Sequence, residues 1–289
     1  MAGKAGPPVI GIDLGGTKIM AGVVASDDRI LGRSKRSTPA KEGGAAILAT
    51  MLSCVDEALA EARLTRRDVV AAGVGSPGPL DVESGVILYS ANLNVQNFPL
   101  GPELSAALGV PVRVQNDVRA GGYGEYMLGA GRGYTDVIAA FVGTGIGGCL
   151  IQGGKIVAGA TNNAGEIGHI VVKAGGPRCG CGSKGCMEAF ASKTAIANRL
   201  IKAAKKRSCP LGEKILRKGR LKSGDLAQAV QNKDEIAVRE VERAAFYLGV
   251  GLGGLVNVLG PQVVIIGGGV VGALGRPFLE QIESSARKQ

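Results

Sequence analysis

The stretch from Glu166 to Glu188 constrains this chain more than any other part of its sequence. It contains the only histidine and three of the six cysteines, spaced as H-x9-C-x-C-x4-C. These four residues are His169, Cys179, Cys181 and Cys186. Structural zinc sites are closed tetrahedral sets of four nitrogen or sulfur ligands, so the spacing predicts a zinc ion that folds this loop. The alternative is three ordinary cysteines in a glycine-rich loop, of which a disulfide would leave one unpaired.

Two glutamates, Glu166 and Glu188, flank the four candidate ligands. If zinc folds the loop, both glutamates and His169 are held close together on a rigid hairpin. A pocket for a polar small molecule requires such an arrangement.

The composition indicates a globular α/β enzyme. A chain of 289 residues favours two domains, and 45% hydrophobic residues with 48 glycines and few aromatics are typical of an α/β protein. The sequence has no run of 18 apolar residues, so we predict no membrane-spanning helix. The opening residues also lack the apolar region of a signal peptide. Six cysteines, several at metal spacing, fit a reducing compartment, so we predict a cytoplasmic protein.

The net charge of +10 is concentrated in one segment. Between Lys202 and Lys222 there are nine lysines or arginines and one acid, Glu213. No aromatic residue or recognisable module accompanies them, so we predict no specific nucleic-acid binding. A solvated helical face is the favoured interpretation, with anion steering or a protein partner as alternatives.

Two glycine-rich turns lie between predicted strands. The first, residues 15–18, joins strands at 9–14 and 19–25, and the second, residues 143–148, joins strands at 137–142 and 149–151. Backbone N–H groups and a hydroxyl at such turns bind phosphate, and Asp13 is placed to hold magnesium through its waters. A plain hairpin turn with a capping aspartate is the alternative for the first turn. The repetition suggests a duplicated domain with a nucleotide clamped between the copies.

Two further positions follow predicted strands. Asp117 comes after a strand at 110–114, where open α/β sheets place functional groups, although an ordinary helix N-cap is the alternative. Gly267–Gly269 end the last predicted strand, where a nucleoside can lie against bare backbone. Asn92, Asn94 and Asn97 are predicted in a loop. The remaining predicted strands are 30–38 and 69–74, and the predicted helices are 45–64, 99–108, 192–206, 223–231, 234–259 and 277–287.

Six motifs together resemble the ROK sugar kinases, and within that family its ATP-dependent glucokinases. They are DLGGTKI (13–19), ANL (91–93), QND (115–117), GTGIGG (143–148), EIGH (166–169) and CGCGSKGCME (179–188). The resemblance extends from Val9 to about Gly272. It implies the actin-like ATPase fold, an α/β fold of two ribonuclease-H-like domains on either side of a cleft. We predict a smaller domain at 1–116 and a larger one at 117–289 that carries the zinc loop.

The resemblance implies ATP-dependent phosphorylation of a hexose at the 6-hydroxyl, glucose first, with Asp117 as general base. The implied hexose-binding residues are Asn92, Asn116, Asp117, Glu166, His169 and Glu188. The implied ATP-binding residues are Asp13 on the magnesium side, Gly15, Gly16, Thr17, Lys18, Gly143, Thr144, Gly145, Gly267, Gly268 and Gly269. One ring nitrogen of His169 would bind the structural zinc while the other faces the sugar. The expected cofactors are Zn²⁺ and Mg²⁺ with ATP, and the expected assembly is a homodimer or homotetramer.

Alternatives within the family remain open. N-acetylmannosamine, N-acetylglucosamine, mannose or allose can replace glucose, because the same residues serve them. A sugar-responsive repressor needs a helix-turn-helix domain before the first glycine turn, and only about a dozen residues precede Asp13. Cys149 stands where the family usually has a third glycine, and we expect little effect. Members usually continue past the GGGV strand with another strand and a helix. We therefore expect either that this helix is missing or that the first domain is closed in another way.

Overall fold

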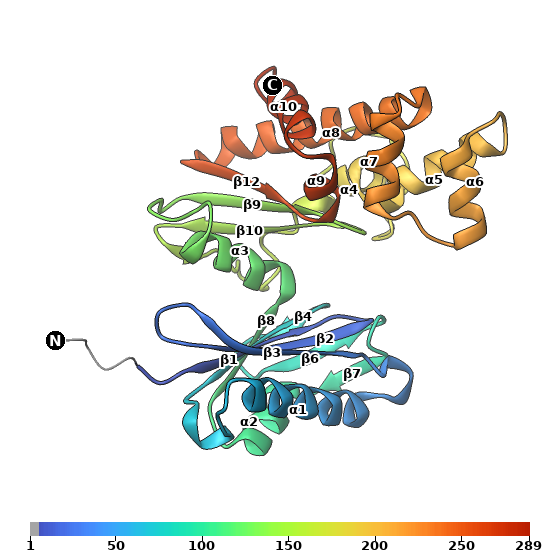
Figure 1. Ribbon diagram of the computed structural model, residues 1–289. Coiled ribbons are helices and arrows are strands. Elements are labelled where there is room, and N and C mark those ends of the chain that lie inside the picture. The colour runs from blue at the N-terminus through green and yellow to red at the C-terminus, as the bar shows by residue number, and fades with distance from the viewer. Residues whose placement is uncertain (1–5) are drawn as a thin grey trace. The chain divides into compact units, whose positions relative to one another are not determined.

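The computed structural model describes residues 6–289, and the chain separates into two compact units (Figure 1). Unit 1 runs to Gly121 and also includes Gly159–Asn163, whereas unit 2 comprises Gly122–Ala158 and Ala164–Gln289. The division falls inside helix α3 (Asp117–Leu128). The boundary predicted between residues 116 and 117 stays a prediction.

Unit 1 is built on a five-stranded sheet with the order β3-β2-β1-β4-β8. Its strands are β1 (Val9–Leu14), β2 (Lys18–Val24), β3 (Ile30–Ser37), β4 (Ala72–Ser76) and β8 (Val112–Asn116). Strand β1 pairs antiparallel with β2 and parallel with β4. Helices α1 (Gly44–Glu61) and α2 (Leu100–Leu108) pack together on one face of the sheet (Figure 1).

Burial alternates along β1, as expected of a strand with one face in the core. Ile10, Ile12 and Leu14 are buried in the core of unit 1, while the intervening Asp13 is not buried. The carboxylate of Asp13 therefore lies on the side of the sheet away from the core of unit 1.

A small three-stranded sheet, which was not predicted, includes part of the segment in which Asn92, Asn94 and Asn97 were expected to form a loop. Its strands are β5 (Leu80–Asp81), β6 (Val86–Ser90) and β7 (Val95–Phe98). Asn97 lies in β7, so the loop prediction is wrong there, whereas Asn92 does lie in the turn between β6 and β7. The strand forms because Val95 and Phe98 reach the core of unit 1 despite their polar neighbours. Two short 3-10 helices, η1 (Ala40–Glu42) and η2 (Arg66–Asp68), complete unit 1.

Unit 2 repeats the central strand arrangement of unit 1. Its sheet has the order β11-β10-β9-β12, with β9 (Val137–Val142), β10 (Ile146–Gln152), β11 (Lys155–Ile156) and β12 (Val263–Gly267). Strand β9 pairs antiparallel with β10 and parallel with β12. Each glycine-rich turn thus joins two antiparallel strands, the first of which has a parallel neighbour.

Both faces of the unit 2 sheet are buried. Ile138, Ala140 and Val142 belong to the large helical core, whereas Val137 and Ala139 pack in a smaller cluster with Tyr126 of α3. A strand buried on both faces has a continuous apolar sequence, which explains the run VIAAFV in β9.

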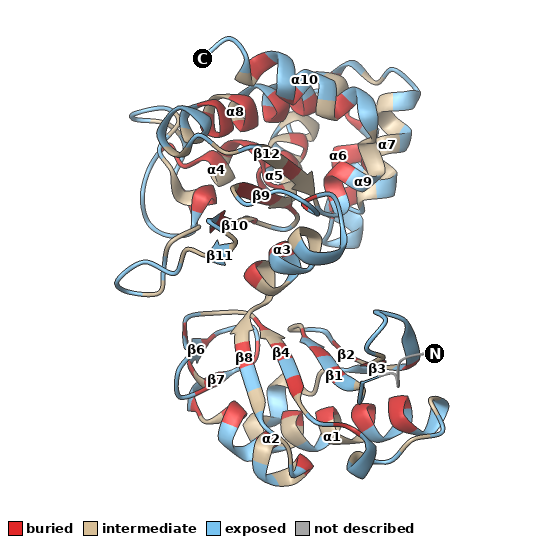
Figure 2. Cartoon of the chain, turned by 90° about the vertical axis from the view of Figure 1, so that its left-hand side faces the viewer, coloured by how far each residue is buried: buried red, intermediate tan, exposed pale blue. Residues whose placement is uncertain are grey.

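Helices form most of the rest of unit 2. They are α4 (Met187–Ala191), α5 (Lys193–Ala204), α6 (Pro210–Lys218), α7 (Ser223–Gln231), α8 (Glu235–Leu259), α9 (Gly269–Leu274) and α10 (Arg276–Ala286), with the 3-10 helix η3 (Ile167–His169). Buried residues recur along α8 at helical spacing (Figure 2). Helices α4, α6 and α9 were not predicted; α4 and α9 have only five and six residues, whereas α6 is as long as the predicted α7. The segment of nine basic residues is divided between α5, α6 and their connections, so it forms no single helical face.

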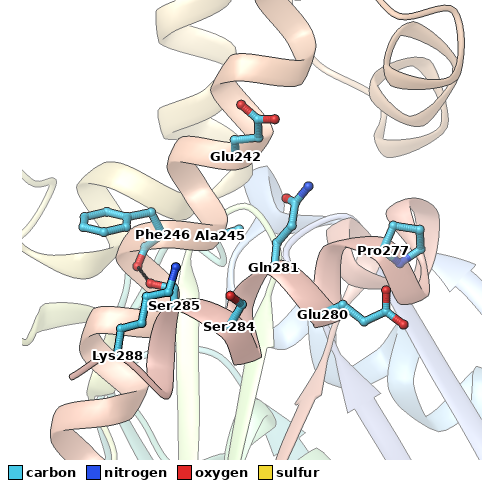
Figure 3. A pocket seen from close by; sticks show the side chains of 9 residues that line it. All are labelled: Glu242, Ala245, Phe246, Pro277, Glu280, Gln281, Ser284, Ser285 and Lys288. Atoms are coloured by element: carbon cyan, nitrogen blue, oxygen red, sulfur yellow. Dashed lines mark hydrogen bonds between the residues drawn. The ribbon is translucent and has the colours of Figure 1, made fainter.

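Helix α10 packs along α8. Gly249 of α8 permits the contact, because a side chain there would collide with Ser285. The Ser285 hydroxyl donates a hydrogen bond to the Phe246 carbonyl at 2.8 Å (Figure 3). Beside this contact lies a hollow of about 570 Å³, whose charged lining residues are Glu242, Glu280 and Lys288 (Figure 3).

Candidate active site and metal centre

The first glycine turn, between β1 and β2, is tightly held. The Gly15 N–H donates to the Lys18 carbonyl at 2.9 Å, and the Thr38 hydroxyl donates to the Gly15 carbonyl at 2.6 Å. The N–H groups of Gly16 and Thr17 donate to no acceptor within residues 6–289. Consecutive unpaired N–H groups at a turn can donate hydrogen bonds to the oxygens of a phosphate group.

Asn92 lies against this turn. A side chain added at Gly16 would meet the Asn92 Cβ atom at 3.0 Å and its carbonyl oxygen at 3.2 Å. The fold thus brings together two motifs that are far apart in the sequence, and close approach explains why glycine is required at position 16.

Asp117 opens α3 immediately after β8. The Asn116 Oδ1 atom accepts the N–H of Arg119 at 3.1 Å, which is the geometry of a helix N-cap. The Asp117 Oδ1 atom accepts the neighbouring Val118 N–H at 2.8 Å. Because Asn116 caps the helix, the N-cap alternative does not explain why an aspartate stands at position 117.

Two carboxyl groups interact at this edge of the sheet. Burial raises the pKa of Asp117. Burial, and then the charge of Asp117, raise the pKa of Asp13 at the end of β1. A side chain at Gly75, near the end of β4, would meet the Asp117 Cα atom at 3.3 Å. The carboxyl ends of three neighbouring strands therefore converge on one acidic site, where open α/β sheets place their functional groups.

A buried arginine attaches a distant segment to unit 1. Arg119 is only 4% exposed, and its guanidinium donates to the Asn162 Oδ1 and carbonyl oxygens at 2.6 and 2.8 Å. The Asn162 side chain in turn donates to the Leu80 carbonyl at 3.3 Å. This network is not predictable from the sequence, since nothing in the residues around Arg119 marks it as buried. Its effect is to hold Gly159–Asn163, which end two residues before the EIGH motif, on the helix that Asp117 opens.

The second glycine turn, between β9 and β10, is fixed by other groups. Gly143 N–H donates to the Gly145 carbonyl at 2.9 Å, and the first residues of α5 bind the Gly143 and Thr144 carbonyls. The Ile146 N–H donates to Glu188 Oε2 at 2.9 Å, and any side chain at Gly145 would collide with that carboxylate. The N–H groups of Thr144 and Gly145 donate to no acceptor in the described part of the chain, as in the first turn.

The four candidate zinc ligands converge in unit 2. Their ligand atoms all lie within 4.8 Å of one another. Cys179 Sγ is 3.7 Å from His169 Nδ1, and Cys181 Sγ is 3.7 Å from Cys186 Sγ. Sulfur ligands about 2.3 Å from a tetrahedral zinc ion lie about 3.8 Å apart, so the set fits zinc. His169 would bind through Nδ1, which leaves Nε2 for another partner.

The chemistry of the thiols also fits a cation. Burial raises the pKa of Cys179 to about 12, so this thiol ionises at neutral pH only beside a positive charge. The Ser183 N–H lowers the pKa of the exposed Cys181 to about 7. All six cysteines are free thiols.

The metal loop is a narrow hairpin joined to the second glycine turn. The Cys179 N–H donates to the Ser183 carbonyl at 2.8 Å. Gly185 has a φ of 85°, and a side chain there would collide with the Lys173 carbonyl. Cys186 directly precedes α4, so Glu188 lies in the first turn of that helix. Its second oxygen is 3.6 Å from Cys179 Sγ. Glu188 therefore connects the metal loop to the turn at Gly145.

Comparison with known proteins identifies the family of the chain. The ROK family matches residues 9–289. The chain belongs to the ROK family. A glucokinase from Halalkalibacterium halodurans is 33% identical over 282 residues, which are 96% of this chain and 86% of the relative. A ROK hexokinase from Thermus thermophilus superposes with a TM-score of 0.82 at 36% identity, over 97% of this chain and 88% of the other.

A second solved structure is a ROK family glucokinase from Streptomyces griseus in complex with glucose and AMPPNP. It has a TM-score of 0.80 and 34% identity, and the match covers 97% of this chain and 89% of that one. The predicted resemblance to ROK kinases and the predicted actin-like ATPase fold are confirmed.

The two units of this ROK protein divide the predicted site residues between them. Unit 1 brings together Asp13, Gly15, Gly16, Asn92, Asn116 and Asp117, and unit 2 brings together Gly145, His169, Glu188 and the three cysteines. The Glu166 side chain is exposed and contacts none of them through a hydrogen bond or ion pair. Gly268, with φ of 97°, is the N-cap residue of α9, and its backbone lies against the end of β9. No helix within residues 6–289 is both long and apolar enough to cross a membrane.

Proposed function

We propose that this ROK protein transfers the γ-phosphoryl group of ATP to the 6-hydroxyl of a hexose, glucose first, with Asp117 as general base. The chain is an ATP-dependent sugar kinase of the ROK family, as its kinase relatives show. The hydroxyl that reacts, the choice of glucose and the residue roles are our proposals.

The observation that carries the proposal is the environment of Asp117. It lies at the carboxyl edge of the unit 1 sheet, and burial raises the pKa of its carboxyl group. Asn116 caps α3, so the Asp117 side chain is not needed as the helix cap. A base is most effective when its pKa lies near the working pH, and a placed base contributes about 10²–10⁴-fold. Asp117 would accept the proton of the attacking hydroxyl, while positioning and charge stabilisation supply the rest of the catalysis.

We assign the remaining residues by what their groups can bind. Hexose hydroxyls would be bound by Asn92, Asn116, Asp117, Glu166, His169 and Glu188. Such polar groups reject analogues that lack a hydroxyl far better than an apolar pocket does. The unpaired N–H groups at Gly16, Thr17, Thr144 and Gly145 would bind phosphate oxygens, supported by Gly15, Lys18 and Gly143, with Gly267, Gly268 and Gly269 near the nucleoside.

Two metal ions fit the proposal. Asp13 would hold, through water, the Mg²⁺ that neutralises the ATP phosphates. His169, Cys179, Cys181 and Cys186 would hold a structural Zn²⁺, which fixes the hairpin that carries Glu188. We also propose a cytoplasmic setting, since reduced thiols are needed for this set, and a homodimer or homotetramer, which light scattering would test.

The decisive experiment measures ADP release with ATP over a panel of hexoses and N-acetylhexosamines, and identifies the phosphorylated position by NMR. We expect the highest kcat/KM with glucose and a 6-phosphate product. A higher value with N-acetylmannosamine, N-acetylglucosamine, mannose or allose would reassign the substrate within the family. Turnover of no sugar, together with sequence-specific DNA binding, would favour a repressor and refute the proposal.

A further inference from the structure

A hollow between α5 and α8 has a composition unlike the rest of unit 2. Its volume is about 670 Å³, within the range of roughly 300–1,000 Å³ typical of small-molecule sites. Seven of its lining residues are basic and one is acidic. Six of the basic residues come from α5, the segment after it, and α8: Arg199, Lys202, Lys206, Arg207, Arg239 and Arg243.

The single acid of this pocket is already engaged. Glu240 is 7% exposed, and its carboxylate forms a salt bridge with the Arg199 Nε atom. The Arg199 Nη2 atom is buried and has no hydrogen-bond partner among residues 6–289. A buried donor without a partner costs free energy, so Glu240 compensates the Arg199 guanidinium only in part.

The other cations of the pocket have no acidic partner. None of them forms a salt bridge within the described chain, and Arg243 only lies over the Phe190 ring at 5.7 Å. Burial and then, in part, the charge of Arg243 lower the pKa of Arg199. Unneutralised positive charges concentrated in a concave site attract anions.

The neighbouring hollow shows that this charge is not a general property of α8. The hollow between α8 and α10 has two acids and one lysine (Figure 3). The α5–α8 pocket also has no aromatic residue in its lining, so it lacks the stacking surface that single-stranded nucleic acid uses. A compact anion fits the pocket better than a nucleic-acid strand does.

We propose that the α5–α8 pocket binds a small anion that carries two or more phosphate groups. Arginine forks bind phosphate oxygens in bidentate fashion, and lysines add point charges. The cations of the pocket are spread over two helices, so a single phosphate group can contact only some of them. An anion with two or more phosphate groups can contact more of them and should bind more tightly. Pro177 and Arg178 of the metal loop also line it, so the occupant would lie against the segment that leads to Cys179.

The test is a calorimetric titration of pyrophosphate into the full chain, saturated with glucose and Mg²⁺–AMPPNP so that the nucleotide site is filled. We expect one saturable site near physiological salt, and binding of inorganic phosphate about tenfold weaker. The double variant Lys202→Gln/Arg239→Gln removes two exposed cations of the pocket and should weaken pyrophosphate binding by at least about tenfold.

The matched control is Arg217→Gln/Lys218→Gln, which removes the same charge from exposed positions on α6 outside the pocket. It should bind pyrophosphate like the wild type, and the melting temperatures of both double variants should match that of the wild type. Absence of saturable binding, or an equal loss in the two double variants, would overturn the proposal. So would a duplex DNA that binds more tightly than pyrophosphate through Lys202 and Arg239.

Discussion

The two glycine-rich turns occupy equivalent places in units 1 and 2 but are supported by different groups. Both join antiparallel strands, β1 to β2 and β9 to β10, and both leave two consecutive N–H groups unpaired in the part of the chain described. The first turn lies beside the carboxyl groups of Asp13 and Asp117, whose pKa values are raised.

The second turn is supported by a carboxylate that is already used. Glu188 accepts the Ile146 N–H and contacts Cys179, so it ties the turn to the metal loop. The same backbone turn thus lies beside two carboxyl groups of raised pKa in unit 1 and is joined to the hairpin of candidate metal ligands in unit 2. The contrast supports our proposal that the general base lies in unit 1, whereas both units supply groups that bind ligands.

The largest expected effect comes from Asp117→Asn. The amide cannot accept the hydroxyl proton, so kcat with glucose should fall about 10²–10⁴-fold while the KM for glucose changes little. Steady-state kinetics would measure both constants. Asp28→Asn is the matched control in unit 1, because Asp28 is exposed and its positive φ of 67° suits asparagine. More than a tenth of the wild-type kcat in Asp117→Asn would remove it from the role of base.

Removal of a metal ligand tests the frame of unit 2. Cys181→Ser replaces the one exposed cysteine of the set, so little packing is lost with the thiol. We expect about one zinc per wild-type chain, well under half of that in the variant, and a melting temperature lower by several degrees, because metal binding is coupled to folding.

Elemental analysis and thermal denaturation measure these effects, with Lys184→Gln as the control on the same loop. Wild-type protein purified without chelator that contains no zinc would contradict the assignment of this set.

Glu188 can be separated into its two roles by two variants. In Glu188→Gln the amide oxygen can still accept the Ile146 N–H, so the second turn is preserved while the charge is lost. We expect the glucose KM to rise about tenfold and the ATP KM to stay near the wild-type value, since bonds to charged groups are stronger than neutral ones.

Glu188→Ala removes both roles and should raise the ATP KM as well. If the glutamine variant keeps the wild-type glucose KM, Glu188 supports the turn alone and does not bind the sugar.

Local patterns predicted the parts of the fold that local sequence determines. The alternation in β1, the apolar run of β9 and the thiol spacing each reflect a short segment, and the strands and metal set follow from them. The Arg119–Asn162 network could not be predicted, because its members meet only in the folded chain. The α5–α8 pocket was missed for the same reason, since Arg178 and Arg239 are distant in sequence from the basic segment that was noticed.

The smallest expected effect concerns stability and pH. The folded state raises the pKa of Asp117, so its contribution to stability is fully present below the unfolded pKa of about 3.9 and is lost as the pH rises through the folded value. At pH 7 the ionised carboxylate therefore lowers the stability of the folded state, and asparagine avoids this loss. Asp117→Asn should melt at a higher temperature than the wild type at pH 7, and the gain should shrink towards pH 4.

Asp136 of unit 2 should show the opposite dependence of stability on pH. The Thr135 hydroxyl and the Gly153 N–H lower the pKa of Asp136, so its contribution is present above the unfolded pKa and is lost as the pH falls through the folded value. Asp136→Asn should therefore melt below the wild type at pH 7, and the deficit should close in acid. Melting curves of both variants between pH 4 and pH 8 test the pair. Differences of the same sign would show that the two carboxyl groups do not lie in the contrasting environments described for them.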